Sequence, residues 1–154
     1  MDEQMIRAKE VYEKLCAAIE DRDWKYEKKE EDLVVVFSVS GEDIPMHFVI
    51  KVDANRSLVR VTSPLMFHMP EEKRVDGAIA SCAASFGLAD GSFDYDISDG
   101  SIAFRMTATY RDSEISEKML QYMISCACHV VDLYNDRFLM LSLGKIDVDA
   151  FLGK

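Results

Sequence analysis

The segment SFDYDISDGSIAFRMT, residues 92–107, decides the fold class of this chain because its letters predict an antiparallel hairpin. Apolar and polar residues alternate on both sides of Asp99-Gly100, a dipeptide that suits a two-residue type I′ turn. Such a turn would set three apolar pairs opposite each other: Ile97 with Ile102, Tyr95 with Phe104, and Phe93 with Met106. The same register sets Asp94 opposite Arg105 on the other face, so the turn and the pattern agree.

The residues before this hairpin predict one helix and then a run of strands. Apolar residues recur at helical spacing over residues 3–21. Alternation and β-branched residues then predict strands at residues 24–26, 33–41, 46–53 and 58–67. Pro64 within the last of these indicates an edge position or a bulge, since proline cannot donate a hydrogen bond to a neighbouring strand.

Two further helices are expected. Pro70 begins the second, which ends near Gly87. Ser113 caps the final helix, which runs to about Leu143, with a kink or break at residues 135–137 left open. The tail is expected to dock back onto the domain through Ile146, Val148 and Phe151. The order α-β-β-β-α-β-β-α predicts a single α+β domain over residues 1–154, an antiparallel sheet flanked by helices.

The second helix has an unusual composition. Val75, Ile79, Cys82 and Phe86 recur at helical spacing and form its apolar stripe. The remaining positions of this helix are mostly small residues: Gly77, Ala78, Ala80, Ser81, Ala83 and Ala84. Small residues permit close approach to a neighbouring surface, either within the fold or on a partner.

The stretch MISCACHVVDLY, residues 123–134, suggests a metal site when it is read as a string of letters. On a helix, however, residues two apart lie about 200° apart around the axis, so Cys126 and Cys128 point to nearly opposite sides. His129 lies on a polar face and cannot join Cys126 around one zinc ion. We therefore predict no metal site, with Cys126 and Cys82 as small core residues and Cys128 and His129 facing solvent or a second subunit.

Catalytic motifs are missing from the sequence. It contains no GxSxG, HExxH, GxGxxG or phosphate-binding loop, and His47, His68 and His129 have no nucleophile at a recognisable spacing. The acidic run at residues 90–100 departs from a calcium-binding loop by one residue, and Arg105 occupies the position of the required glutamate. We predict a protein without enzymatic activity or cofactor. An active site built from distant residues stays open as a less favoured alternative.

Charge and apolar content limit the partners. The chain has 18 basic and 28 acidic residues, a net charge of −10, so a nucleic acid would be repelled on average. The longest apolar run, residues 33–37, is far shorter than the ~20 residues that span a bilayer. The amino terminus lacks the pattern of a secretory signal, and the four cysteines have no framework spacing. These features predict a cytoplasmic protein that binds neither nucleic acid nor membrane.

The segment SPLMFHMPEEK, residues 63–73, is the most suggestive surface candidate. Four large apolar residues crowd between its two prolines: Leu65, Met66, Phe67 and Met69. They could cover the core at the end of the strand, or form an exposed strip that receives a partner. Methionine adapts to varied partners, which favours a speculative partner-binding role for these four residues.

The sequence also resembles the YbjN domain family, whose members have a fold like that of the type III secretion chaperones. The resemblance is carried by Pro70-Glu71-Glu72-Lys73-Arg74, by Gly91 and Phe93, by Asp99-Gly100 and by Phe104-Arg105, with matching element order over residues 3–143. The chain departs from the family in the second helix, where AIASCAASF stands in place of leucines and asparagine. The resemblance implies a non-enzymatic domain that dimerises and binds an extended or helical protein segment.

We therefore expect a cytoplasmic protein-binding module, chaperone-like or regulatory, that acts as a homodimer and binds a protein or peptide segment. A regulatory domain that senses a small ligand is the alternative, and it would need a closed pocket between the sheet and the final helix. An enzyme is a third class, and it would need polar groups converging around one of the three histidines.

Overall fold

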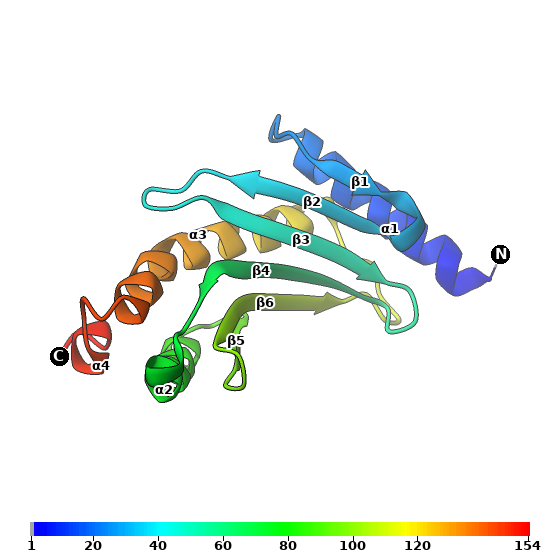
Figure 1. The fold of residues 1–154 in the computed structure, drawn as a ribbon. Coiled ribbons are helices and arrows are strands. Elements are labelled where there is room, and N and C mark those ends of the chain that lie inside the picture. The colour runs from blue at the N-terminus through cyan, green and yellow to red at the C-terminus, as the bar shows by residue number, and fades with distance from the viewer. Residues whose placement is uncertain (1) are drawn as a thin grey trace.

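The computed structural model describes residues 2–154, which form one six-stranded antiparallel sheet with helices (Figure 1). The strands are β1 (Glu27–Lys29), β2 (Val34–Val39), β3 (Met46–Asp53), β4 (Leu58–His68), β5 (Ser92–Asp96) and β6 (Ser101–Thr109). Their order in the sheet is β1-β2-β3-β4-β6-β5. The helices are α1 (Glu3–Glu20), α2 (Arg74–Phe86), α3 (Glu117–Ser142) and α4 (Val148–Phe151), with 3-10 turns η1 (Glu30–Asp32) and η2 (Glu71–Lys73). The predicted α+β class is confirmed, and the strand expected at residues 24–26 begins three residues later as β1.

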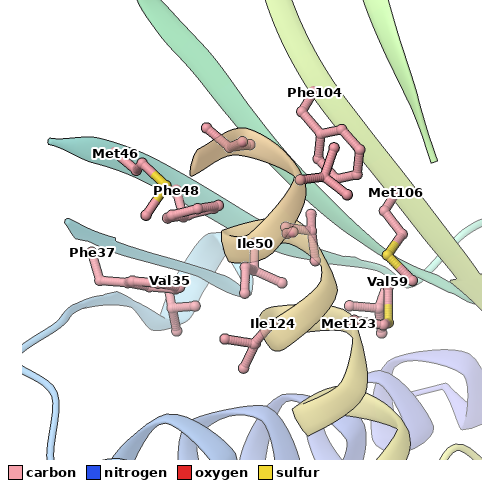
Figure 2. Close-up of a cluster of buried hydrophobic side chains, with 14 of the residues drawn as sticks. Val35, Phe37, Met46, Phe48, Ile50, Val59, Phe104, Met106, Met123 and Ile124 are labelled. Carbon is pink, nitrogen blue, oxygen red and sulfur yellow. The ribbon is translucent and has the colours of Figure 1, made fainter. Parts of the chain in front are cut away.

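The core lies between one face of the sheet and helices α1 and α3. Alternate residues of the central strands point to this face and are buried: Val35, Phe37, Phe48, Ile50, Val59, Val61, Phe104 and Met106. Figure 2 shows several of them gathered around Met123 and Ile124 of α3. The intervening residues of the same strands point to the opposite face, over which no helix of residues 2–154 lies (Figure 1).

Helix α3 is one continuous helix of 26 residues. Its amino-terminal cap is Ser116, whose Oγ accepts a hydrogen bond from the Met119 amide, so the cap predicted at Ser113 is wrong by three residues. The helix continues without a break through residues 135–137. The side chains of Asn135 and Phe138 are buried there. The Phe138 ring contacts the ring of Phe151 at a centroid distance of 4.9 Å, so the tail docks as predicted.

Pro64 lies at an irregularity in β4, as its chemistry predicts. The register between β4 and β6 shifts between Pro64 and His68. The alternative of an edge strand is wrong, since β4 lies between β3 and β6. Its pairing with β3 nevertheless ends at Thr62, and the Ser63 hydroxyl then donates to the His47 carbonyl at 2.7 Å. A side chain thus replaces the missing backbone hydrogen bond where the strands separate.

The hairpin of β5 and β6 is confirmed, but its predicted register is wrong by two residues. Tyr95 pairs with Ile102, and the connection is residues 97–100 instead of Asp99-Gly100 alone. The Asp96 carboxylate accepts hydrogen bonds from the amide and hydroxyl of Ser98, which stabilises the longer turn. A shift of two residues preserves which face each side chain occupies, so Arg105 still forms an ion pair with Asp94, at 2.8 Å.

Candidate functional site

Helix α2 turns its small side chains toward the core and its large apolar side chains toward solvent, the reverse of the usual arrangement. Its buried residues are the small ones: Gly77, Ala80, Ser81 and Ala84. The exposed fractions of Val75, Ile79 and Phe86 are 65%, 45% and 92%. Cys82 is also exposed, which corrects its prediction as a core residue. We call Val75, Ile79, Cys82 and Phe86 the α2 stripe, and it faces outward.

The close contact between α2 and the hairpin explains this orientation. A Cβ atom added at Gly77 would lie 2.6 Å from the Tyr95 hydroxyl oxygen and 2.7 Å from Cγ of Met69. That hydroxyl donates a hydrogen bond to the Arg74 carbonyl at 2.7 Å, and the Phe93 amide donates to the Ser85 hydroxyl at 2.8 Å. Only small residues fit on this side of α2, so the large ones are left at the surface.

The four residues predicted as a partner-binding strip are not exposed together. Leu65 and Met69 are buried, and Phe67 is half-buried against the core. The Met69 amide donates to the Gly100 carbonyl at 2.8 Å, which joins this segment to the hairpin turn. Met66 alone has a largely exposed side chain, at 72%. Partner binding by this segment therefore stays a prediction, with Met66 as its accessible residue.

Several other exposed apolar residues lie in segments that adjoin α2. Ile97 belongs to the β5–β6 turn, where the Arg74 guanidinium donates to the Ser98 carbonyl at 2.6 Å. Leu143 precedes Gly144, which lies beside Lys73 at the start of α2. Leu152 follows α4, which contacts α2 (Figure 1). Exposed apolar side chains therefore concentrate at the end of the molecule formed by α2, the β5–β6 turn and α4.

The CACH segment lies within α3, as the sequence predicts. Residues 2–154 contain no group of three histidine, cysteine or acidic side chains that could hold a metal ion. Cys126 and Cys128 are both half-buried against the core, so Cys128 is less exposed than predicted. Burial raises the pKa of the Cys128 thiol to about 11. His129 is exposed, as predicted.

The three histidines lie on separate elements. His47 lies on β3, and its Nδ1 atom is 3.3 Å from the hydroxyl oxygen of Ser38. His68 lies at the end of β4, and its Nδ1 atom is 3.2 Å from the Asp99 carbonyl oxygen. His129 lies on α3. The structure therefore does not bring the sequence-predicted histidines together.

A groove of about 720 Å³ lies between α1 and the β1–η1 segment. Apolar and sulfur-bearing side chains line part of it: Met5, Tyr12, Cys16 and Leu33. The Tyr12 hydroxyl donates to the Val34 carbonyl at 2.8 Å, and burial raises the pKa of Tyr12 to about 12. The space between the sheet and α3, where a ligand-sensing domain would need its pocket, is filled by the buried side chains of Figure 2.

The described chain thus defines an α+β domain with one sheet face covered by helices and an exposed apolar stripe on its second helix. Its fold is similar to that of the crystal structure of YbjN from E. coli, a protein described there as a candidate transcription regulator. The TM-score is 0.58 with 5% sequence identity, over 79% of this chain and 86% of that chain. The sequence matches no protein-family model and no curated protein. The likeness confirms the fold that the sequence resemblance implied.

No helix among residues 2–154 has both the length and the apolar character needed to cross a bilayer.

Proposed function

We propose that this chain is a non-enzymatic protein-binding module, chaperone-like or regulatory, that acts in the cytoplasm as a homodimer. The observation that carries the proposal is the α2 stripe, whose residues are spaced by four, three and four positions. This is the heptad spacing by which one helix packs against another. A protein-binding role agrees with the similarity of the fold to YbjN, which is described as a candidate regulator.

A second copy is the simplest occupant of the α2 stripe. A two-fold axis places the same surface on both subunits, so the stripe of one copy would meet an identical stripe. The small outward residues Ala78 and Ala83 are half-buried and leave room between the larger side chains for a partner helix. Stable interfaces bury about 800 Å² on each partner, so adjoining residues such as Ile97 are expected to contribute with the stripe.

The oligomeric state of a matched pair of variants tests this proposal. Ile79 on α2 and Ile6 on α1 have nearly equal exposed fractions, 45% and 46%, and both lie on helices. We expect light scattering after size exclusion, at tens of micromolar, to report a dimer for the unmodified chain and for Ile6→Glu. Ile79→Glu should be a folded monomer, since the charge would be buried at the interface.

A monomeric unmodified chain at these concentrations would contradict the homodimer, and so would a dimer that survives both Ile79→Glu and Phe86→Glu. Far-ultraviolet circular dichroism of each variant would separate loss of association from loss of folding.

A small-ligand sensor is the second candidate function, favoured by the groove between α1 and β1–η1. Its volume of about 720 Å³ lies in the range of known small-molecule sites, ~300–1,000 Å³. A ligand bound there would stabilise the fold by mass action. A metabolite screen by thermal shift tests this role, with Ala17→Trp as the variant that should fill the groove and abolish any shift.

A further inference from the structure

The face of the sheet opposite α1 and α3 is a candidate binding surface of its own. Cross-strand pairs lie on the same face, so the strand register identifies its members. One row runs from Val34 through Lys51 and Arg60 to Thr107, and the next runs from Val36 through Val49 and Thr62 to Arg105. We call this surface the open sheet face, and it mixes small or β-branched side chains with cations.

The open sheet face carries its cations near the centre, whereas its edges carry carboxylates: Glu27 on β1, and Asp94 and Asp96 on β5. The net charge of the chain is −10, yet strands β2, β3, β4 and β6 contain a single carboxylate, Asp53. The same four strands contain Lys51, Arg60 and Arg105. Asp53 is engaged locally, because its side chain accepts a hydrogen bond from the Arg56 amide at 3.0 Å. The centre of the open sheet face is therefore basic.

Two of these cations have no acidic partner. Lys51 and Arg60 are directly opposite each other in the register, an arrangement that destabilises a sheet unless an anion compensates it. Among residues 2–154, neither lies within ion-pair distance of a carboxylate, whereas Arg105 pairs with Asp94 at 2.8 Å. Nε of Arg60 is also buried without a hydrogen-bond partner. The exposed Lys51 ammonium and the half-buried Arg60 side chain are thus adjacent cations, a position suited to an anionic group from outside the domain.

We propose that the open sheet face binds an acidic amphipathic helix of a partner protein, which deepens the proposed function and rests on it. Lys51 and Arg60 would face carboxylates of that helix, and its apolar residues would cover Val36 and Val49. The occupant is a helix because the backbone N–H and C=O groups of a sheet point along the sheet toward neighbouring strands, not out of its face. An extended segment lying across the open sheet face would find no backbone partners there, whereas a helix satisfies its own backbone groups.

Other occupants fit the face less well. A nucleic acid needs a broad array of cations, and the acidic charge of the rest of the chain would repel it. A second copy is already assigned to the α2 stripe, which adjoins β5 at the end of the sheet. An acidic helix matches both the two unpaired cations and the apolar residues of the adjacent row, Val36 and Val49.

The test uses the isotope-labelled full chain and two synthetic amphipathic peptides of about five helical turns, ~18 residues. Each has leucine along one face; one carries glutamate and the other lysine on the flanking positions. We expect the glutamate peptide to shift the amide resonances of β3 and β4. Its affinity should fall as the salt concentration is raised. Lys51→Met with Arg60→Met should reduce its affinity at least about tenfold. Lys118→Glu, an exposed site on α3, should change it less than about twofold.

Each of these results would overturn the proposal: no binding up to about 1 mM peptide, equal binding of the lysine peptide, equal loss of affinity in Lys118→Glu, or shifts confined to α2. Displacement of the glutamate peptide by duplex DNA would overturn it in favour of a nucleic-acid surface. The titration is repeated on Ile79→Glu, so failure of the homodimer and failure of the open sheet face are separate results.

Discussion

Gly77 and Tyr95 lie so close together that a Cβ atom on the glycine would be 2.6 Å from the tyrosine hydroxyl oxygen. Because that hydroxyl is bonded to the Arg74 carbonyl, it cannot move away without losing a hydrogen bond. This contact holds α2 with its small side inward and its large side outward. The absence of a side chain at Gly77 is therefore one reason that the α2 stripe faces outward.

Replacing that glycine should destabilise the domain. We expect Gly77→Val to lower the free energy of unfolding by about 2–3 kcal/mol, since overpacking would displace Tyr95 and the buried Met69. Gly87→Val at the exposed end of the same helix is the matched control and should change it by less than about 0.5 kcal/mol. Urea titration measures both values. Equal effects at the two positions would contradict this account of α2.

Gly100 is expected to tolerate substitution less well than a second glycine with similar backbone geometry. Gly100 and Gly144 have φ angles of +77° and +72°, so each should lose about 1–2 kcal/mol on mutation to alanine. At Gly100 the new Cβ would also lie 2.2 Å from the Met69 carbonyl oxygen, whereas at Gly144 it meets only the Lys73 chain at 3.9 Å. Gly100→Ala should therefore lower the melting temperature further than Gly144→Ala. A similar decrease for both would show that the turn can shift away from Met69.

The raised pKa of Cys128 predicts slow alkylation. With a pKa of about 11, only about one thiol in a thousand is ionised at pH 8, and the thiolate is the reactive form. Exposed Cys82 should react with iodoacetamide well before Cys128, as followed by mass spectrometry of peptides. A Cys128 that reacts as fast as Cys82 would mean that this part of α3 opens readily.

The same pKa gives a pH dependence of stability with a defined sign. An unfolded cysteine ionises near pH 8.5, whereas burial keeps the folded Cys128 protonated up to about pH 11. The folded state thus holds more protons in this window, so stability falls as pH rises from about 9 to 11. Cys128→Ala should reduce the slope of the midpoint urea concentration against pH, while exposed Cys82→Ala should not.

Removing an unpaired cation should not weaken the fold. Arg60→Met keeps the aliphatic volume and removes a charged group whose Nε is buried without a partner, so we expect unchanged or slightly higher stability, by up to about 1 kcal/mol. Arg105→Met is the matched control on the same face. It loses the ion pair with Asp94 and should be destabilised by about 0.2–1 kcal/mol. A larger loss in Arg60→Met than in Arg105→Met would contradict the view that Arg60 lacks a partner within the domain.

Periodicity predicted the elements but not how they pack. Alternation in residues 46–53 and 92–107 identified strands and their buried faces, because a strand has only two faces. The hairpin register was wrong because the Asp96 side chain stabilises a four-residue connection, which competes with the shorter turn at Asp99-Gly100. The local sequence is compatible with both the two-residue turn and the four-residue connection, so it does not distinguish them.

The candidate site was harder to predict than the fold. Helical spacing found Val75, Ile79, Cys82 and Phe86 but could not tell an outward stripe from an inward one. The signal that could have decided the orientation was the opposite face, where the residues are too small to fill a core. The sequence also contains the cations of the open sheet face, but it does not show that they are neighbours. Only the register of β3 and β4 places Lys51 beside Arg60.

The two sides of α2 limit substitution differently. Its inward side leaves no room for larger side chains, so we expect substitutions there to cost folding free energy. Its outward side contacts nothing that the domain needs, so it can acquire new side chains without loss of the fold. Descendants of one ancestor could in this way retain the architecture while changing what they recognise, and likeness in shape would outlast likeness in sequence.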